Sequence, residues 1–367
     1  MKAIGLMSGT SVDGVDAVLL ELEPPEVRAV PRVLAHAYLP FEDALRRELA
    51  APLELSLPRI AALHYELPEL YAEVVRRLPG WNEADCVGMH GQTVWHAPAS
   101  SGAARPHTLQ LGNSGVLAAR LGLPVVGDFR SADLAHGGEG APIIPLCHWY
   151  FVPPERGPVL VVNLGGIANY TYVAPRLDDV VASDIGPGMM LTDAFARLVS
   201  DGREHFDRDG VLSRNGTPQR AMVDRILRHP FFERRAPRTT GREDFGADFF
   251  AVLAREFATV APADQLCSCM QATAEAIAAA LRELPHVQGI ILPGGGAQHP
   301  GLRERIRSAV APCPVEVPDD GVLAPQHHEA AGMALLAART LHRLPSALPR
   351  VTGARRAAVL GHVYWPD

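Results

Sequence analysis

Two stretches of the chain show the same order of apolar and polar positions: a short apolar run, a polar turn and a second apolar run. This order predicts two strands joined by a turn. The strands are expected at residues 3–7 and 15–22 in the first stretch and at residues 159–164 and 167–173 in the second. The similarity concerns architecture rather than literal sequence, so it leaves open whether the two halves form a true internal repeat.

Helical periodicity alternates with apolar strands through the rest of the chain, which is typical of an α/β fold. Helices are expected at Ile60–Leu78, Ser114–Leu121, Met190–Val199, Asp264–Leu284, Gly301–Val310 and about Glu329–Leu344. Further strands are expected at Asp85–Met89, Pro124–Asp128, Val180–Asp184 and Val287–Leu292. The charged and glycine-containing segments 201–216 and 234–246 predict loops.

The composition favours a globular protein of two domains with a small-molecule partner. The 367 residues exceed the size at which one hydrophobic core keeps growing. Hydrophobic residues make up 47% of the chain and charged residues 20%, which is enough apolar material for packed interiors. A formal net charge of -7 without a basic cluster argues against nucleic acid and anionic membranes as partners. A homodimer is compatible with these features.

The N-terminal segment and the cysteines predict a cytoplasmic protein. Polar residues from Ser8 onward interrupt the first apolar run before it could act as a signal peptide, and no long apolar run follows elsewhere. The 5 cysteines are odd in number and lack C-x-x-C spacing. We therefore expect buried thiols in a reducing compartment rather than disulfides or a zinc site.

Lys2 is the only lysine among the 34 Lys and Arg residues. This excludes a Walker A lysine, a protein-kinase strand lysine and a Schiff-base lysine. A protein of this composition that handles phosphates must therefore use backbone amides, arginines and a metal ion.

The first polar turn has the composition of a phosphate-binding loop. The segment Gly9–Asp16 exposes several N–H groups and hydroxyls, and its glycines let an anion approach the backbone. The Asp13 carboxylate would repel bare phosphate, so it fits this site only with Mg²⁺, a water molecule or a substrate hydroxyl in between. An ordinary hairpin turn is the alternative, because Asp-Gly is common in such turns.

Two further glycine turns have a composition suited to a nucleotide. Gly165 and Gly166 occupy the turn of the second hairpin, where they could hold a polyphosphate. The triplet 294–296 follows an expected strand and precedes an expected helix, which suits contact with a base or ribose. The triplet does not complete a G-x-G-x-x-G motif, because position 299 is His299, and by itself it is a weak signal.

Asp184 is a candidate general base. It ends an expected strand and precedes Gly186 and Gly188, which leave access to its carboxylate. Helix capping or turn formation is an equally compatible role.

Polar residues after two other expected strands are candidates for substrate contacts. His90 and Gln92 follow one strand, and Asp128 and Arg130 follow another. These side chains could hydrogen-bond a sugar, and Arg130 could bind a carboxylate or phosphate. A structural ion pair between Asp128 and Arg130 is equally compatible.

The sequence His327-His328-Glu329 does not predict a metal site. The zinc-protease pattern H-E-x-x-H would need a histidine at position 332, which is Gly332. We interpret the segment as a solvated helix start, with Glu329 as a candidate ligand for a substrate hydroxyl.

The chain resembles the anhydro-N-acetylmuramic acid kinase family over essentially its whole length. The resemblance begins with the motifs Met7–Asp16, His90–His96 and Gly127–Arg130. It continues in the family's order with Gly138–Pro142, Asn163–Asn169, Asp184–Gly188, Thr240–Glu243, Gly294–Gly296 and Val351–Ala354.

The resemblance implies an α/β protein with the two-domain actin-like fold of sugar kinases, acetate kinases and actin, with duplicated mixed-sheet halves and an interdomain cleft. The domains are expected at residues 1–130 with about 340–367, and at residues 131–339. The implied reaction uses ATP to phosphorylate O6 of 1,6-anhydro-N-acetylmuramic acid while water opens the 1,6-anhydro bridge. The product would be N-acetylmuramic acid 6-phosphate, an intermediate of cell-wall amino sugar recycling.

The resemblance also implies roles for individual residues. Asp184 matches the general base that activates water, and Arg130 and Glu329 match positions near the sugar, where we also expect His90 and Gln92. The residues expected to bind ATP are Gly9, Thr10, Ser11, Val12, Asp13, Gly14, Val15, Asp16, Gly165, Gly166, Gly294, Gly295 and Gly296. Mg²⁺ is expected with ATP, but no metal ligands are predicted.

Several positions depart from the family pattern. Ile185 and Met189 replace the usual Thr and Asn, His299 replaces an Asn, and the usual acidic residue is missing from the stretch 111–114. A kinase for a related anhydrosugar, a non-catalytic actin-like ATP-binding module and a glycosidase that uses Asp13 with Asp184 are therefore the competing hypotheses.

Overall fold

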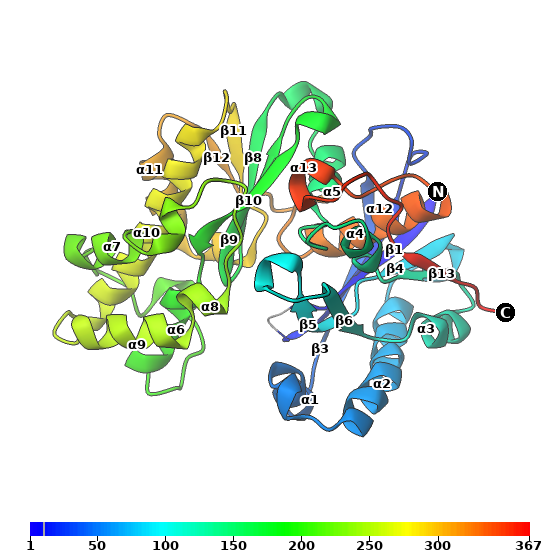
Figure 1. The fold of residues 1–367 in the computed structure, drawn as a ribbon, viewed down its shortest axis with the longest axis horizontal. Helices are drawn as coiled ribbons and strands as arrows, with labels where there is room; N and C mark the ends of the chain where they lie inside the picture. Colours follow the sequence, from blue (N-terminus) through cyan, green and yellow to red (C-terminus); the bar gives the residue numbers. More distant parts are fainter. Residues whose placement is uncertain (10–11) are drawn as a thin grey trace. The chain divides into compact units, whose positions relative to one another are not determined.

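The computed structural model describes residues 1–9 and 12–367, and it divides into two compact units (Figure 1). The first unit comprises Met1–Pro154 and Asp320–Asp367, and the second comprises Glu155–Asp319. Each unit has its own β-sheet and its own hydrophobic core.

The first unit contains a six-stranded mixed sheet in the order β13-β7-β4-β1-β2-β3. Its strands are β1 (Lys2–Met7), β2 (Gly14–Glu21), β3 (Arg32–Pro40), β4 (Cys86–Met89), β7 (Val125–Gly127) and β13 (His362–Tyr364). The antiparallel pair β1 and β2 is the predicted hairpin, with Ala3 opposite Leu20 and Met7 opposite Asp16. β4 pairs parallel to β1, and β7 pairs parallel to β4.

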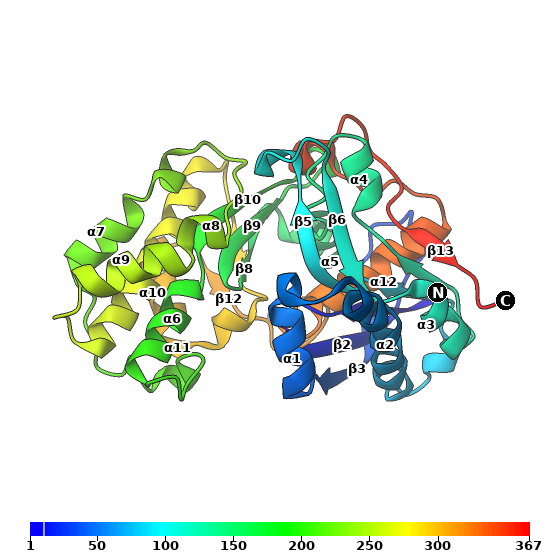
Figure 2. The ribbon, with the colours of Figure 1, turned by 60° about the horizontal axis from the view of Figure 1, so that its bottom comes forward.

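A separate antiparallel hairpin of β5 (Gln92–Ala97) and β6 (His107–Leu111) follows β4 (Figure 2). Neither this hairpin nor β3 was predicted from the sequence. The helices of the first unit are α1 (Asp43–Ala50), α2 (Leu57–Arg76), α3 (Ser114–Leu121), α4 (Ser131–Ala135), α5 (Pro145–Phe151), α12 (His328–Leu341) and α13 (Pro349–Thr352). The bounds of α3 match the prediction because Asn113 caps its first turn and Gly122 adopts a left-handed conformation at its end.

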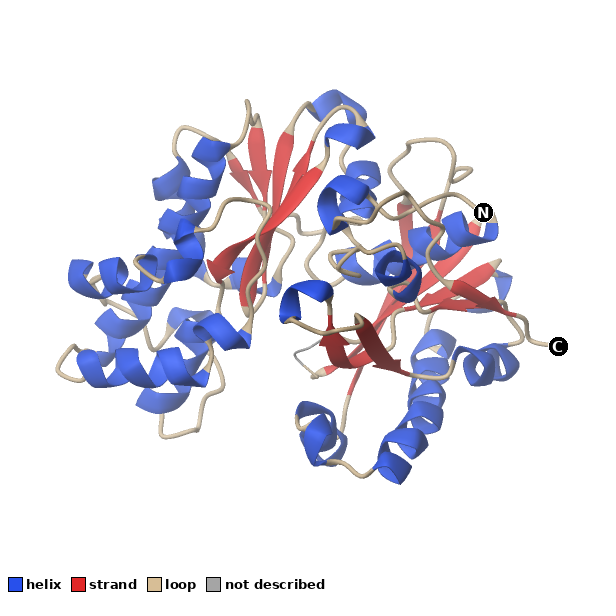
Figure 3. Cartoon of the chain, in the orientation of Figure 1, coloured by secondary structure: helices blue, strands red, loops and turns tan. Residues whose placement is uncertain are grey.

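The second unit contains a five-stranded sheet in the order β10-β9-β8-β11-β12, with helices packed beside it (Figure 3). Its strands are β8 (Val159–Leu164), β9 (Ile167–Val173), β10 (Val181–Pro187), β11 (Gly289–Ile291) and β12 (Val315–Glu316). Its helices are α6 (Met190–Val199), α7 (Arg220–Leu227), α8 (Arg242–Phe245), α9 (Ala247–Glu256), α10 (Pro262–Glu283) and α11 (Pro300–Val310). The short helix α8 lies within the segment 234–246, which was predicted as a loop.

The two sheets share one topology. In each, the first strand of the unit lies between an antiparallel hairpin partner on one side and later parallel strands on the other. Across the sheets, the order β3-β2-β1-β4-β7 therefore corresponds to β10-β9-β8-β11-β12. This confirms the predicted duplication of mixed-sheet halves, which is the actin-like α/β fold.

Helix α12 packs directly on the sheet of the first unit through two glycines. A Cβ atom on Gly5 of β1 would lie 1.7 Å from the carbonyl oxygen of Ala330, and one on Gly88 of β4 would lie 2.1 Å from that of Met333. The backbone of α12 therefore belongs with β1 and β4. The two units therefore differ from the expected domains, because residues 131–154 and 320–339 belong to the first unit rather than to the second.

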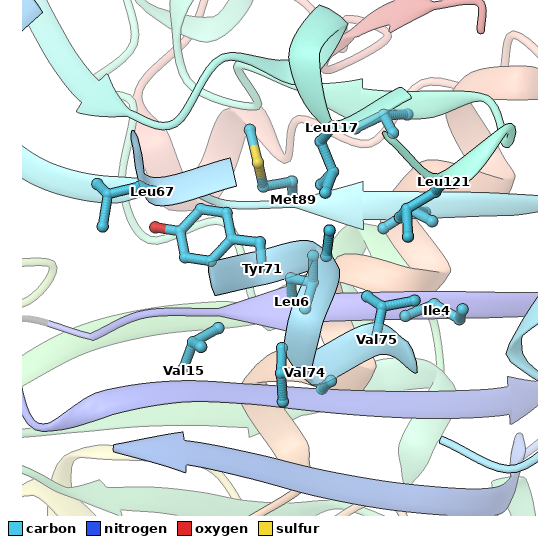
Figure 4. Close-up of a cluster of buried hydrophobic side chains, with 14 of the residues drawn as sticks. Ile4, Leu6, Val15, Leu67, Tyr71, Val74, Val75, Met89, Leu117 and Leu121 are labelled. Atoms are coloured by element: carbon cyan, nitrogen blue, oxygen red, sulfur yellow. The ribbon is translucent and has the colours of Figure 1, made fainter. Parts of the chain in front are cut away.

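The core of the first unit forms where α2 and α3 cover one face of the sheet (Figure 4). Tyr71, Val74 and Val75 of α2 are nearly or fully buried against Ile4 and Leu6 of β1. Burying apolar side chains of this size contributes about 1.5–3 kcal/mol each. This packing holds the C-terminal end of β1 in place, and the predicted phosphate-binding turn begins there.

Candidate active site

Asp184 lies in β10 of the second unit, beside an irregularity of the strand. The register between β10 and β9 shifts between Asp184 and Gly186. Gly186 has φ +145°, and a Cβ there would lie 2.9 Å from the ring of Phe232. The glycine therefore allows the bulge next to the carboxylate, after which pairing with β9 resumes at Gly186 and Pro187.

The loop 234–246 holds the Asp184 carboxylate in position. The Thr240 N–H donates to Oδ2 of Asp184 at 2.9 Å, and the Asp184 N–H donates to the Arg238 carbonyl at 2.9 Å. The loop is fixed in turn by an ion pair between Arg234 and Asp244 at 3.0 Å. The Thr240 hydroxyl donates to the same Asp244 at 2.8 Å. These contacts restrict the orientation of the candidate base.

Burial raises the pKa of Asp184 to about 6, and the nearby Glu243 carboxylate acts in the same direction. The hydrogen bond from Thr240 and the charge of Arg238 oppose this rise. A carboxylate with this pKa is deprotonated at neutral pH and is a stronger base than an ordinary aspartate. The Asp184 carboxylate can therefore accept a proton at neutral pH.

The three glycine segments of the second unit lie against one another. A Cβ on Gly188 would lie 2.3 Å from the Gly165 carbonyl, and one on Gly294 would lie 2.3 Å from the Leu164 backbone nitrogen. The Met189 and Gly188 N–H groups donate to the Gly165 and Gly166 carbonyls at 2.8 and 2.9 Å. The backbone of this turn is thus fixed by the start of α6.

Several N–H groups of these turns lack an acceptor within residues 1–9 and 12–367. They belong to Gly165, Gly166, Gly295 and Gly296. A Cβ on Gly295 would meet nothing within 4 Å, so the backbone there is open. Unsatisfied N–H groups around glycines are the groups that bind phosphate oxygens in proteins.

In the first unit, the predicted phosphate-binding turn joins β1 to β2. Thr10 and Ser11 lie outside the described residues. The Val12 N–H donates to the Gly9 carbonyl at 3.1 Å, and Val12 has φ +56°. Asp13 is exposed, whereas β2 already begins at Gly14.

Three residues of the predicted turn have structural contacts of their own. A Cβ on Gly14 would lie 2.4 Å from the Leu39 carbonyl, so this glycine permits pairing with β3. Val15 is fully buried in the core. Asp16 accepts a hydrogen bond from Nε2 of His36 at 2.9 Å. The turn that can face a ligand is therefore shorter than the predicted segment.

The Gln92 side chain supports this turn through hydrogen bonds. Its amide oxygen accepts from the Ser8 hydroxyl, and its amide nitrogen donates to the Gly9 carbonyl at 3.2 Å. The side chain is 1% exposed. Gln92 was expected to contact the sugar, but in the structure its polar atoms hold the turn.

The buried His90 and the half-buried Arg130 form a hydrogen-bonded pair. Nδ1 of His90 donates to the Gly91 carbonyl at 2.7 Å, so Nε2 is free to accept from Nη2 of Arg130 at 2.8 Å. Burial lowers the pKa of His90 to about 3, and the Arg130 charge adds to this. His90 is therefore neutral at physiological pH, which suits its role as an acceptor.

Arg130 makes a third contact, from Nη1 to the Gly140 carbonyl at 2.8 Å. Burial lowers its pKa to about 10, while the charge of Glu329 opposes this. The guanidinium thus stays protonated at neutral pH. Asp128, the alternative partner, instead accepts from the Ser131 N–H at 3.2 Å, and no ion pair with Arg130 is found in the described part of the chain.

Comparisons with known proteins identify the family of this chain. A family model described as anhydro-N-acetylmuramic acid kinase matches residues 1–366. The protein of that name from Gloeobacter violaceus is 37% identical over 374 residues, covering 99% of this chain and 98% of its own. The one from Salinibacter ruber is 38% identical over 387 residues, covering 99% and 96%. The chain belongs to the anhydro-N-acetylmuramic acid kinase family. It is an ATP-dependent sugar kinase, as the resemblance predicted.

Solved structures are more distant. The activator of the 2-hydroxyisocaproyl-CoA dehydratase from Clostridium difficile with bound ADPNP is 13% identical, with a TM-score of 0.47, and the match covers 92% of this chain and 94% of that one. A ROK family glucokinase from Streptomyces griseus in complex with glucose and AMPPNP is 14% identical, with a TM-score of 0.40, covering 91% and 98%.

The positions that depart from the anhydro-N-acetylmuramic acid kinase pattern lie in packed surroundings. Ile185 is 1% exposed and Met189 is 9% exposed, and both join the core of the second unit. His299 caps α11 by accepting from the Leu302 N–H at 3.2 Å, and its other ring nitrogen pairs with Asp207 at 3.0 Å. These substitutions therefore have structural partners of their own.

Other expectations about this kinase family member concern thiols, metals and membranes. Cys86, Cys147, Cys267 and Cys269 are buried free thiols as predicted, whereas Cys313 is partly exposed. In the described ranges, 1–9 and 12–367, no group of three His, Cys, Asp or Glu side chains is arranged to hold a metal ion. No helix within those ranges is long and apolar enough to cross a membrane.

The contacts of Thr240 and Ser8 were not predicted from the sequence motifs. Thr240 lies in a family motif, but its N–H bonds a carboxylate 56 positions earlier in the chain. Ser8 precedes the glycine turn and contacts Gln92, 84 positions later. Both contacts depend on tertiary packing, for which a single sequence carries no local signal.

Proposed function

We propose that this kinase opens the 1,6-anhydro bridge of 1,6-anhydro-N-acetylmuramic acid with water and transfers the γ-phosphoryl group of ATP to O6. The product is N-acetylmuramic acid 6-phosphate. The family assignment and the names of the relatives support this substrate. The observation that carries the mechanism is the partly buried Asp184 carboxylate with its raised pKa, held by the loop 234–246.

Asp184 acts as the general base in this proposal. It accepts a proton from water as the water oxygen bonds to C1 of the sugar and the bond between C1 and O6 breaks. O6 then attacks the γ-phosphorus, and the bond to the leaving ADP breaks. One water and one ATP are consumed for each product and ADP, and the water proton is left on Asp184. A positioned base contributes about 10²–10⁴ in rate to such a step.

ATP is proposed to bind through backbone N–H groups rather than lysine. The open N–H groups of Gly165, Gly166, Gly295 and Gly296 provide donors for phosphate oxygens. Mg²⁺ enters with ATP as part of the substrate. The exposed Asp13 carboxylate has the chemistry to bind it, because Mg²⁺ in kinases uses one or two carboxylates besides the phosphates.

The sugar is proposed to contact Arg130, with His90 and Glu329 as supporting polar groups. Muramic acid carries a lactyl carboxylate, for which a fixed guanidinium is a suitable partner. His90 and Gly140 hold three of the guanidinium N–H groups. The remaining donors of Arg130 and the Glu329 carboxylate are then available for the sugar.

Reaction in ¹⁸O-labelled water tests this proposal directly. The protein is incubated with ATP, Mg²⁺ and the anhydrosugar, and the products are analysed by mass spectrometry at short times. We expect one ¹⁸O in the sugar phosphate, located at C1 by fragmentation, and none in the phosphoryl group. A phosphorylated sugar with an intact bridge would overturn the proposed hydrolysis, and bridge opening without ATP would indicate a glycosidase.

The raised pKa of Asp184 predicts how kcat/KM depends on pH. The base must be ionised, so below about pH 6 the value should fall about tenfold for each pH unit, and above that pH it should level off. Steady-state rates from pH 4.5 to 8.5, with stability checked at each pH, measure this profile. An acidic limb centred near pH 4 would show that Asp184 titrates like an ordinary carboxyl and would contradict the assignment.

A further inference from the structure

Asp133 of α4 is a fully buried carboxylate to which the proposed function gives no role. Its Oδ2 accepts from the Gly140 N–H at 2.8 Å, and its Oδ1 accepts from the Thr352 hydroxyl at 2.7 Å. Asp133 is 0% exposed and Thr352 is 3% exposed. The carboxylate therefore joins two family motifs, Gly138–Pro142 and Val351–Ala354, that are distant in the sequence.

The glycine-rich loop 137–140 is folded around this carboxylate. A Cβ on Gly138 would lie 2.2 Å from Oδ2 of Asp133, so only glycine fits there. The Gly138 N–H donates to the Asp133 carbonyl at 2.9 Å, and the Glu139 N–H donates to the Thr352 carbonyl at 2.8 Å. Gly140 itself has φ +66°. The loop conformation thus depends on Asp133 and on the end of α13.

Gly140 links Asp133 to Arg130, the arginine proposed to bind the sugar, through two hydrogen bonds. Its N–H is bound by Asp133, while its carbonyl accepts from Nη1 of Arg130 at 2.8 Å. The opposite side of the guanidinium is bound by Nε2 of His90. The plane of Arg130 is therefore set by two acceptors, one of which is placed by the buried carboxylate.

We propose that Asp133 is a positioning residue for the reaction: through Gly140 it fixes the orientation in which Arg130 meets the carboxylate of the sugar. This inference depends on the proposed function, since that proposal assigns Arg130 to the sugar. Asp133 is connected to Arg130 through the N–H and the carbonyl of Gly140, so the effect passes through hydrogen bonds to the loop backbone.

Three substitutions separate the hydrogen bonds from the charge. Asp133→Ala removes both acceptors, and Thr352→Val removes one donor with little change of volume. Asp133→Asn can keep both bonds, because its amide oxygen accepts from Gly140 while its amide nitrogen donates to Thr352. The Thr352 hydroxyl can then donate to the Leu348 carbonyl, which lies 3.4 Å away.

Thr340→Val is the matched control for Thr352→Val. Thr340 is also a buried threonine of the first unit, 6% exposed, and its hydroxyl donates to the Leu336 and Leu360 carbonyls rather than to the loop. Thr340→Val should therefore resemble Thr352→Val in stability and resemble wild type in KM for the sugar.

Steady-state kinetics with the anhydrosugar and ATP provide the first readout. Loss of one buried hydrogen bond corresponds to about a fivefold change in an equilibrium constant. We expect KM for the sugar to rise at least about tenfold in Asp133→Ala and about threefold to fivefold in Thr352→Val, with KM for ATP within about twofold of wild type. Asp133→Asn should restore the sugar KM to within about twofold of wild type.

Side-chain ¹⁵N NMR of His90 provides a second readout that needs no turnover. Because Nε2 of His90 accepts from Arg130, its chemical shift reports the guanidinium position. The shift should change in Thr352→Val and not in Thr340→Val. If wild type fails to turn over the sugar while this shift changes as expected, the proposed function fails and the positioning network stands.

Three results would overturn the inference. The first is an unchanged sugar KM and an unchanged His90 signal in Thr352→Val. The second is that KM for the sugar and KM for ATP rise equally in the variants, in proportion to their loss of melting temperature. The third is an Asp133→Asn variant that is as impaired as Asp133→Ala. The first would show that Gly140 does not transmit the contact. The second would show a purely structural role, and the third would show that charge rather than bond geometry matters.

Discussion

Replacement of Asp184 by asparagine should lower turnover of the anhydrosugar by about 10²–10⁴, which corresponds to about 3–5 kcal/mol of barrier. Asparagine has nearly the same shape, and its amide oxygen can still accept from the Thr240 N–H. It cannot accept the proton of water. Initial rates of ADP and sugar phosphate formation measure the loss, and ATP affinity measured separately should change little.

Asp264→Asn is the matched control for this substitution. Asp264 lies in the same unit, and its carboxylate also accepts a backbone N–H, that of Thr217, at 2.8 Å. The control should keep near-wild-type turnover. An Asp184→Asn variant with near-wild-type turnover would remove Asp184 from the mechanism, and one that also loses ATP affinity would make it a phosphate or metal ligand.

The stability of Asp184→Asn follows from the direction of the pKa shift. Because burial raises the pKa of Asp184 to about 6 in the folded protein, the folded state holds a proton that the unfolded chain releases near pH 4. This favours folding below about pH 4, and the benefit is lost as the pH rises through about 6. At pH 8 the asparagine variant should therefore melt no lower than wild type. A lower melting temperature would show that the loss of turnover includes misfolding.

Local patterns predicted the two β-hairpins that carry the glycine turns, but not every strand of the sheets. Both hairpins occur where alternation between apolar runs and polar turns placed them, because each turn is short and its strands are neighbours in sequence. Asp184 was expected at the end of a strand, but β10 continues to Pro187, so the carboxylate lies within the strand beside its bulge. Its loop partner Thr240 was not found, since that contact requires the fold to bring 184 and 240 together.

Side-chain roles that depend on burial were harder to predict. Gln92 follows a strand like His90, and both were expected at the sugar. Packing instead places the Gln92 amide against Ser8 and Gly9, where both of its polar atoms are used. The domain boundaries had a similar cause, because Gly5 admits α12 onto β1, which lies more than three hundred positions earlier in the chain.

Replacement of Gly188 by alanine should destabilise the second unit by at least about 3 kcal/mol. The new Cβ would lie 2.3 Å from the Gly165 carbonyl oxygen, 2.9 Å from the Ala168 backbone nitrogen and 3.0 Å from the Ile167 carbonyl carbon. All three are backbone atoms, so no side-chain rotation can relieve the clash. The hydrogen bond from the Gly188 N–H to the Gly166 carbonyl, 2.9 Å long, would be strained or lost.

The clash should also displace the N–H groups that we assign to ATP, so turnover should fall together with stability. Thermal unfolding should begin about 6–12 °C lower than in wild type. Gly166→Ala is the control in the same turn, because its Cβ would meet only the Met190 side chain at 3.7 Å, an ordinary contact. It should melt within about 2 °C of wild type. If Gly188→Ala melts like wild type, the close contact between Gly188 and the turn does not exist as described. If the melting temperatures of both variants fall equally, the contact with Gly165 is not the cause.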